Sequence, residues 1–192
     1  AETFLMNQLH FQTVAASKAA RVVTAANGRT VVDFGVRRMH GTDAAMKAAR
    51  AFYVAGVHST SNVLAGLTYG IPVAGTMAHS YVQAHVNEIE AFRAFARLYP
   101  ETVLLVDTYD TLAAVKMLTK YKRIPAVRLD SGDLTSVTKQ VRQILDAAGM
   151  QATKIFTSGD LNEDRIAALL DAGAPIDAFG VGTQLATSYD AP

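Results

Sequence analysis

The sequence predicts an α/β protein whose parallel strands form an irregular or partial barrel. Short apolar runs alternate with helical patterns in the second half of the chain, and these runs end in polar, mostly glycine-bearing clusters at 103–110, 126–133, 155–160 and 178–183. The carboxyl ends of parallel strands are where α/β proteins build their sites, so we expect these clusters to form the rim of one site. An open doubly wound sheet is the alternative, and the number of rim clusters favours the barrel.

The composition fits a buried sheet and argues against several classes of protein. The chain has 192 residues, of which 50% are hydrophobic and 18% are charged, and its net charge is +1. No basic run indicates nucleic-acid binding, and no apolar stretch reaches the ~18 residues of a membrane-spanning helix. The chain has no cysteine, which leaves no disulfide, thiolate nucleophile or thiolate metal site. We expect a cytoplasmic protein.

The first half of the chain begins with a helix, because Phe4, Leu5 and Leu9 recur at roughly helical spacing and Asn27–Gly28 ends the pattern. Thr42 is the expected N-cap of the next helix. The elements predicted up to Pro100 are a helix at 2–25, a strand at 30–36, helices at 42–55 and 61–69, a strand at 71–75 and a long helix at 78–98.

The second half is more regular. Its apolar runs are nearly continuous, which is typical of parallel strands buried on both faces, and the helices between them imply right-handed crossovers. We expect strands at 102–107, 125–130, 153–158 and 177–182, separated by helices at 110–121, 133–148 and 162–172. A further strand is expected near Val57. Residues 1–192 are predicted to form a single α/β barrel core, into which the helix at 2–25 leads.

Glycines and a threonine lie where the last two predicted strands end. Gly159 lies in the first of these clusters, and Gly180, Gly182 and Thr183 lie in the second. The backbone N–H groups of such loops, with the Thr183 hydroxyl, can bind a phosphate. Each glycine alone is better explained by a tight turn with positive φ, but the pair of clusters favours phosphate binding.

Arg128 and Asp130 alternate along one predicted strand and therefore share one of its faces. A bare charge inside a barrel is costly. Arg128 can bind a carboxylate or phosphate through two hydrogen bonds, and Asp130 can stabilise a developing cation or hold a metal-bound water. The alternative is a structural ion pair between the two, with Ser131 or Asp133 as the N-cap of the following helix.

Phe34 and Arg37 repeat this combination on an early strand. Phe34 can stack on a flat ring while Arg37 meets an anion; a core phenylalanine beside a solvated arginine is the alternative. His79 is expected in the first turn of a helix, where the helix dipole disfavours the imidazolium and a neutral imidazole can act as a base or nucleophile. A cap or packing role is the alternative for His79.

Metal chemistry has less support in the sequence. His79 and His85 are too far apart to share one helix face as zinc ligands four residues apart do, so no zinc site is expected. Asp107 and Asp110 could help to hold Mg²⁺ through water molecules. They could equally be carboxylates at the start of a helix.

The chain resembles the nicotinate phosphoribosyltransferase family. Its motifs follow the order of that family and spread over nearly the whole chain; each is weak alone, but jointly they are highly specific. They are DFGVRR at 33–38, STSNVLAG at 59–66, GTMAHS at 75–80, VDTYDT at 106–111, VRLDSGDL at 127–134, SGDLNE at 158–163 and FGVGT at 179–183.

The resemblance implies a type II phosphoribosyltransferase fold, an irregular α/β barrel with a smaller attached domain. It implies transfer of phosphoribosyl from PRPP to the ring nitrogen of nicotinate, giving nicotinate mononucleotide and pyrophosphate in NAD salvage. In that family, ATP hydrolysis is coupled through a transiently phosphorylated histidine, and Mg²⁺ accompanies PRPP and ATP. The resemblance implies no organic prosthetic group, and it implies a homodimer that builds each site from both subunits.

The resemblance also implies roles for individual residues. His79 matches the phosphorylated histidine, and Asp130 matches a carboxylate beside the reacting centre. Thr76 and Arg128 match residues that contact nicotinate, and Arg37 matches an arginine near the substrate anions. The other candidate substrate contacts are Gly159, Gly180, Gly182 and Thr183, which match the pocket for the ribose 5-phosphate, together with Phe34 and Ser131.

Two alternatives stay open at this point. A related nicotinamide phosphoribosyltransferase carries an acidic residue near the position of Ser61, and an acid there would repel a carboxylate, so Ser61 favours nicotinate. The second alternative is an inactive phosphate-binding fragment or subunit. The chain starts inside a helical pattern and lacks the family's N-terminal and C-terminal regions, so we expect a segment of a longer protein. A sugar-phosphate aldolase is disfavoured, because no lysine ends a predicted strand and Lys154 starts one.

Overall fold

The structure is a computed structural model that describes residues 1–121 and 124–187. These residues fall into two compact units. The first contains residues 1–75, 159–168 and 179–187; the second contains residues 76–121, 124–158 and 169–178. Two compact units can belong to one folding domain, so the single domain expected over 1–192 stays a prediction.

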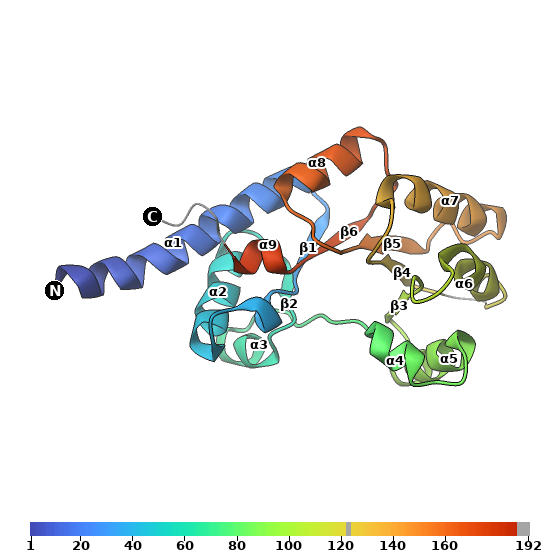
Figure 1. The fold of residues 1–192 in the computed structure, drawn as a ribbon, viewed down its shortest axis with the longest axis horizontal. Helices are drawn as coiled ribbons and strands as arrows, with labels where there is room; N and C mark the ends of the chain where they lie inside the picture. The colour runs from blue at the N-terminus through green and yellow to red at the C-terminus, as the bar shows by residue number, and fades with distance from the viewer. Residues whose placement is uncertain (122–123, 188–192) are drawn as a thin grey trace. The chain divides into compact units, whose positions relative to one another are not determined.

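In the first unit, the long helix α1 (Glu2–Ala25) packs along α2 (Thr42–Val54) (Figure 1). Small side chains such as Ala19 and Ala48 are fully buried, and this lets the two helix backbones approach closely. The remaining elements of this unit are β1 (Thr30–Asp33), the 3₁₀ helix η1 (Val36–Arg38), β2 (Ser59–Thr60), α3 (Val63–Tyr69) and α9 (Thr183–Ala186).

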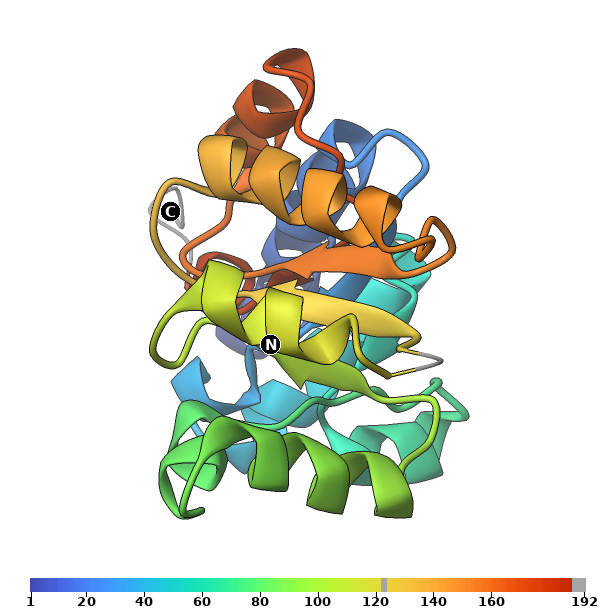
Figure 2. The ribbon, with the colours of Figure 1, turned by 90° about the vertical axis from the view of Figure 1, so that its right-hand side faces the viewer.

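The second unit contains three neighbouring parallel strands, β3 (Val103–Leu105), β4 (Ala126–Leu129) and β5 (Lys154–Thr157). Leu104, Val127 and Ile155 occupy successive strands and are at most 1% exposed. The helices α6 (Thr111–Leu118) and α7 (Leu134–Ala147) cover one face of these strands, as Figure 2 shows. The shorter helices α4 (His79–Gln83) and α5 (Glu88–Leu98) pack on each other.

Helix α8 (Glu163–Asp171) and strand β6 (Ala178–Val181) each begin in one unit and end in the other. Hydrogen bonding gives the strands the order β2-β1-β6-β5-β4-β3, and the pairs β1–β2, β3–β4 and β4–β5 are parallel. The predicted parallel α/β class is confirmed. None of the described helices combines the length and the apolar character that crossing a bilayer requires.

The regular alternation of the second half is confirmed, with strands shorter than predicted, but several elements of the first half differ. The predicted strand at 30–36 ends at Asp33, and η1 takes over at Val36. The predicted strand at 71–75 is wrong: that segment makes only an isolated bridge between Thr60 and Val73. The strand expected near Val57 is β2 at Ser59–Thr60.

Two predictions about helices are also wrong. The single helix expected at 78–98 is divided into α4 and α5, because the Asn87 side chain accepts a hydrogen bond from the Glu90 backbone and begins a new helix there. Thr42 is not an N-cap but the first residue of α2. The cap position belongs to Gly41, whose φ of 94° favours glycine.

Candidate active site

A set of polar side chains at the carboxyl ends of β3, β4 and β5 forms one group with residues before and at the start of α4, joined by hydrogen bonds and by the contact between His79 and Asp130. All of them belong to the second unit. We call this group the rim cluster. Its members are Thr76, His79, Asp107, Thr108, Arg128, Asp130, Ser131 and Ser158.

Arg128 lies at the centre of the rim cluster. Its guanidinium donates from Nε to Ser158 at 2.7 Å, from Nη1 to Thr76 at 2.6 Å and from Nη2 to Asp130 at 2.8 Å. A longer contact of 3.4 Å joins Nη1 to the Met77 carbonyl. The planar fork therefore holds three separate chain segments in one arrangement. The ion pair between Arg128 and Asp130, expected as the structural alternative, is present.

Asp130 follows β4 directly and its carboxylate is held by charged and neutral donors. Its Oδ1 accepts hydrogen bonds from Arg128 and from the Ser158 hydroxyl. Partial burial by itself raises the pKa of Asp130, but the Ser158 hydrogen bond and the Arg128 charge outweigh that effect, so the pKa lies below its usual value. Asp130 is therefore an ionised carboxylate at neutral pH.

His79 is the first residue of α4, as the sequence predicted, and its imidazole lies against the same carboxylate. Its Nε2 is 3.6 Å from Asp130 Oδ2, and its Nδ1 is 3.1 Å from the Thr108 hydroxyl. The side chain is 37% exposed, so the ring edge can be reached from solvent. The cap role offered as the alternative is not observed, because α4 has no side-chain cap.

Asp107 connects the ends of β3 and β4. Its Oδ2 accepts from the Asp130 backbone and from the Ser131 hydroxyl, both at 2.7 Å. Its Oδ1 is buried and has no hydrogen-bond partner among the described residues. Asp110, by contrast, caps α6 by accepting from the Ala113 backbone. Asp110 is therefore a carboxylate at the start of a helix, which was the second interpretation offered above. Asp133 similarly caps α7.

The remaining candidate residues belong to the first unit. Phe34 follows β1 and is half-buried, and Arg37 lies exposed in η1. Gly180 lies inside β6 and is buried, in agreement with the strand predicted at 177–182. Gly159 has a φ of +93°, so the tight-turn reading applies to it.

Gly182 and Thr183 follow β6. A Cβ at Gly182 would lie 3.1 Å from the Phe34 carbonyl oxygen, so the glycine permits a close approach of the two backbones. Thr183 is the half-buried first residue of α9. The structure thus brings the ends of β1 and β6 into close contact within the first unit.

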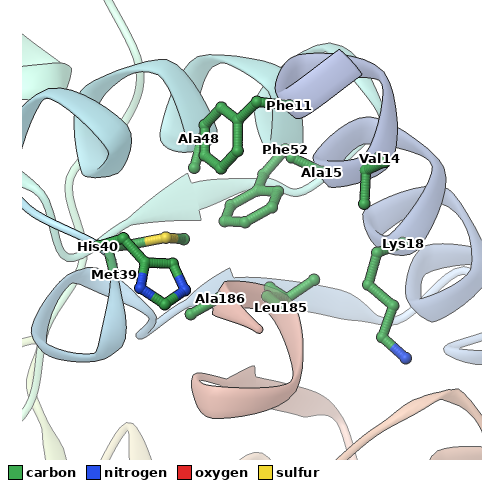
Figure 3. Close-up of a pocket in the computed structure, with 10 residues that line it drawn as sticks. All are labelled: Phe11, Val14, Ala15, Lys18, Met39, His40, Ala48, Phe52, Leu185 and Ala186. Carbon is green, nitrogen blue, oxygen red and sulfur yellow. The ribbon is translucent and has the colours of Figure 1, made fainter. Parts of the chain in front are cut away.

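A pocket in the first unit lies beside α9 but contains no candidate site residue (Figure 3). Its walls are mostly apolar, and the Lys18 ammonium at its edge is paired with Glu163 at 2.7 Å. The lining residues are Phe11, Val14, Ala15, Lys18, Met39, His40, Ala48, Phe52, Leu185 and Ala186.

Sequence comparison gives the rim cluster a family context. The chain matches the model of the nicotinate phosphoribosyltransferase (NAPRTase) family over residues 30–191. It is 61% identical to the nicotinate phosphoribosyltransferase pncB2 of Mycobacterium tuberculosis, over 100% of this chain and 43% of that protein. The chain belongs to the nicotinate phosphoribosyltransferase family. The resemblance expected from its motifs is confirmed.

One further relative and two solved structures are also similar to this chain. The Bacillus subtilis nicotinate phosphoribosyltransferase is 45% identical over 100% of this chain and 41% of that protein. The solved structure of a nicotinate-nucleotide pyrophosphorylase from Pyrococcus furiosus has a TM-score of 0.88 at 32% identity, covering 96% of this chain and 49% of that one. Human nicotinic acid phosphoribosyltransferase has a TM-score of 0.82 at 26% identity, covering 94% and 49%. The chain spans less than half the length of these relatives.

Two members of the rim cluster were not singled out as site residues from the sequence. Ser158 ends the apolar run before Gly159, and Thr108 follows Asp107. Their position at a strand end was a usable signal, because carboxyl strand ends meet at one edge of a parallel sheet. The sequence carried no indication that Ser158 bonds both Arg128 and Asp130, which depends on the register between β4 and β5.

Proposed function

We propose that the protein to which this chain belongs transfers phosphoribosyl from PRPP to nicotinate in NAD salvage. The proposal is supported by family membership and, in the structure, by one observation: the ionised Asp130 carboxylate accepts a hydrogen bond from the Arg128 guanidinium and lies 3.6 Å from the His79 imidazole, at the carboxyl end of the strands. Transfer breaks the bond from the ribose C1 to pyrophosphate and forms a bond to the nicotinate ring nitrogen. Pyrophosphate leaves with the electron pair of the broken bond.

Asp130 is proposed to act at the reacting centre. Departure of pyrophosphate develops positive charge on the ribose ring, and a fixed carboxylate nearby lowers the energy of that state. The hydrogen bonds from Arg128 and Ser158 hold the Asp130 carboxylate in place before the substrate arrives. Arg128 and Thr76 are proposed to contact the carboxylate and ring of nicotinate, with Ser131 as a further substrate contact.

His79 is proposed to couple ATP hydrolysis to the transfer. A ring nitrogen forms a bond to the γ-phosphorus of ATP, the bond to the bridging oxygen breaks, and ADP leaves while the imidazole loses its proton. Attack of water on the same phosphorus later breaks the N–P bond, releases inorganic phosphate and restores the imidazole, which completes the hydrolysis. The phosphorylated ring carries added negative charge beside the site, which can order Mg²⁺ and PRPP. Thr108, 3.1 Å from Nδ1, orients the imidazole for this step.

Mg²⁺ is proposed to accompany PRPP and ATP, whose phosphates bind it. Within residues 1–121 and 124–187, no group of three or more histidine and carboxylate side chains is placed to hold a metal by itself. In the first unit, Phe34, Arg37 and Thr183, with the glycines 159, 180 and 182, are proposed to contact the ring and the phosphates. A homodimer and a cytoplasmic location complete the proposal.

The test is a reaction of the complete protein with PRPP, nicotinate and Mg²⁺, with and without ATP, followed by quantification of nicotinate mononucleotide and pyrophosphate. The His79→Ala variant is expected to lose stimulation by ATP while keeping slow ATP-independent transfer. Equal stimulation in the wild type and the variant would remove His79 from the coupling step. A parallel reaction with nicotinamide in place of nicotinate tests the preference for the carboxylate that Ser61 favours.

A second candidate function is phosphate binding without turnover. It is favoured by the coverage of the relatives, of which this chain spans 43% or less in the two sequences compared. Calorimetry on the 192-residue chain alone distinguishes the candidates. Binding of PRPP without product, with turnover restored by a complementary chain, would favour the second candidate.

A further inference from the structure

Asp33 is a buried carboxylate at the carboxyl end of β1 that the proposed reaction does not use. It is 2% exposed, and each of its oxygens accepts one hydrogen bond of 2.7 Å. Oδ1 accepts from the Gly35 backbone N–H, and Oδ2 accepts from the Thr60 hydroxyl. Burying a carboxylate is costly, so such a residue needs these donors. Across residues 1–121 and 124–187, no salt bridge to Asp33 offsets the cost.

The Gly35 backbone lies so close to the Asp33 carboxylate that a side chain at position 35 would not fit. Its φ is −79°, an ordinary value for any residue, so its conformation does not explain the glycine. A Cβ on Gly35 would instead lie 3.0 Å from Asp33 Oδ1 and 3.4 Å from both the Gly182 carbonyl oxygen and the Ala186 Cβ. The glycine therefore permits a close approach that a side chain would prevent.

The same turn is held from its other side by the segment after β6. The Phe34 N–H donates to the Val181 carbonyl at 2.8 Å, and the Gly182 backbone lies against the Phe34 carbonyl. The turn at 34–35 is thus enclosed between the Asp33 carboxylate and residues 181–186. Arg37 lies in η1, two residues after Gly35, so the position of this turn determines the position of the Arg37 backbone.

Asp33 also holds the segment after β2. Its backbone carbonyl accepts from the Ser61 N–H at 2.8 Å, and Thr60, bound to its side chain, accepts from the Asn62 N–H at 3.0 Å. Asn62 in turn caps α3 by accepting from the Ala65 N–H. One carboxylate therefore ties together the turn that carries Phe34 and Arg37 and the segment that carries Ser61.

We propose that Asp33 is a positioning residue that holds the Phe34–Arg37 turn in place for the phosphate and ring contacts of substrate. The inference rests on the proposed function, because it takes Phe34 and Arg37 as substrate contacts. Asp33 itself touches no substrate. Its carboxylate fixes the turn before substrate binds, which removes part of the ordering cost of binding.

The test compares Thr60→Val, which removes one donor to Asp33, with Thr60→Ser, which keeps it. Asp33→Asn is a second variant, which keeps the size of the side chain but offers one oxygen instead of two. The matched control is Thr138→Val, because Thr138 is also fully buried and its hydroxyl bonds only within its own helix. Each complete protein is titrated with Mg²⁺–PRPP by calorimetry, assayed for KM and kcat, and melted to give Tm.

We expect Thr60→Val and Asp33→Asn to weaken PRPP binding and to raise the KM for PRPP roughly tenfold, with a smaller change in kcat. Thr60→Ser should bind as the wild type does. Thr138→Val should lower Tm without changing PRPP affinity, which separates positioning from stability. Wild-type PRPP affinity in both Thr60→Val and Asp33→Asn would overturn the inference.

The binding measurement also keeps this inference separate from the proposed function. If the wild type gives no nicotinate mononucleotide, the proposed function fails, and the Asp33 inference is decided by the PRPP affinities alone. Weaker binding in Thr60→Val than in Thr60→Ser then supports the positioning role. Equal affinities in these two variants contradict it.

Discussion

At the residue scale, the rim cluster is defined by how Arg128 distributes its hydrogen bonds. A buried ion pair is weak evidence for stability by itself, because desolvation offsets much of the attraction. The Arg128 side chain is 14% exposed and that of Asp130 is 27% exposed, so the pair is only partly withdrawn from water. With Ser158 and Thr76 as additional partners, the pair is a preorganised charged site rather than an isolated structural link.

The lowered pKa of Asp130 should make the stability of the fold depend on pH. Its folded-state pKa is lowered below the unfolded value, so the ionised group stabilises the fold above the unfolded pKa, and that stability is lost as pH falls through the folded pKa. Asp130→Asn should therefore lower the free energy of unfolding by about 1–3 kcal/mol at neutral pH. The difference from the wild type should narrow below pH ~4. Urea denaturation at several pH values measures it, and a difference independent of pH would contradict this assignment.

Ser158 predicts a shift in the pH profile of activity. Its hydroxyl donates to Asp130 and contributes to the low pKa of that carboxyl, so Ser158→Ala should raise the pKa. If Asp130 must be ionised for transfer, the acidic limb of the kcat profile should move to higher pH. If the acidic limb of the kcat profile lies at the same pH in Ser158→Ala as in the wild type, a group other than Asp130 controls it. Thr138→Val, measured alongside, should leave the limb in place.

At the element scale, the sequence predicted helices and strands best where local signals and packing agree. The predicted bounds of α1 are correct because Asn27 and Gly28 both adopt positive φ and end the helix. The strands of the second unit were predictable from continuous apolar runs. The break between α4 and α5 was not, because Val86 continues the apolar pattern although it is 90% exposed, and Asn87 begins a new helix.

Other misses depended on long-range contacts. The apolar segment at 71–75 reads as a strand, but its single bridge is made through Val73. The strand β1 ends early because Asp33 turns its side chain back to the Gly35 backbone. Neither partner could be read from residue types alone. Similarly, Arg128 and Asp130 were predictable as a pair on one face, whereas their bonds to Ser158 depend on the register of the sheet. The bond from Arg128 to Thr76 depends on the placement of the segment before α4.

The contact between α3 and the segment after it predicts a defined loss of stability. A Cβ at Gly66 would lie 2.2 Å from Val73 Cγ2 and 3.0 Å from the Ile71 carbonyl oxygen. Gly66→Ala should therefore cost about 1–3 kcal/mol through overpacking. Combining it with Val73→Ala should recover part of that loss, while Val73→Ala alone should be mild because Val73 is 50% exposed. Thermal unfolding of the four proteins tests this, and additive losses would contradict the contact.

At the scale of the whole molecule, the chain divides into two compact units that each hold part of the candidate site residues. The rim cluster belongs to the second unit, while Phe34, Arg37, Gly182 and Thr183 belong to the first. The sequence identified both groups because each follows an apolar run at a strand end. The family and the parallel α/β class were predictable from ordered motifs, whereas the division into units depends on contacts between distant segments.

The proposed function requires the rim cluster to catalyse phosphoribosyl transfer to nicotinate. The most direct measurement is the rate of nicotinate mononucleotide formation by the complete protein and by its Asp130→Asn and Thr138→Val variants, under one set of PRPP, nicotinate, ATP and Mg²⁺ concentrations. We predict product from the wild type, a loss of roughly a hundredfold or more in Asp130→Asn, and an unchanged rate in Thr138→Val. Wild-type rates in Asp130→Asn, or no product from the wild type, would contradict the claim.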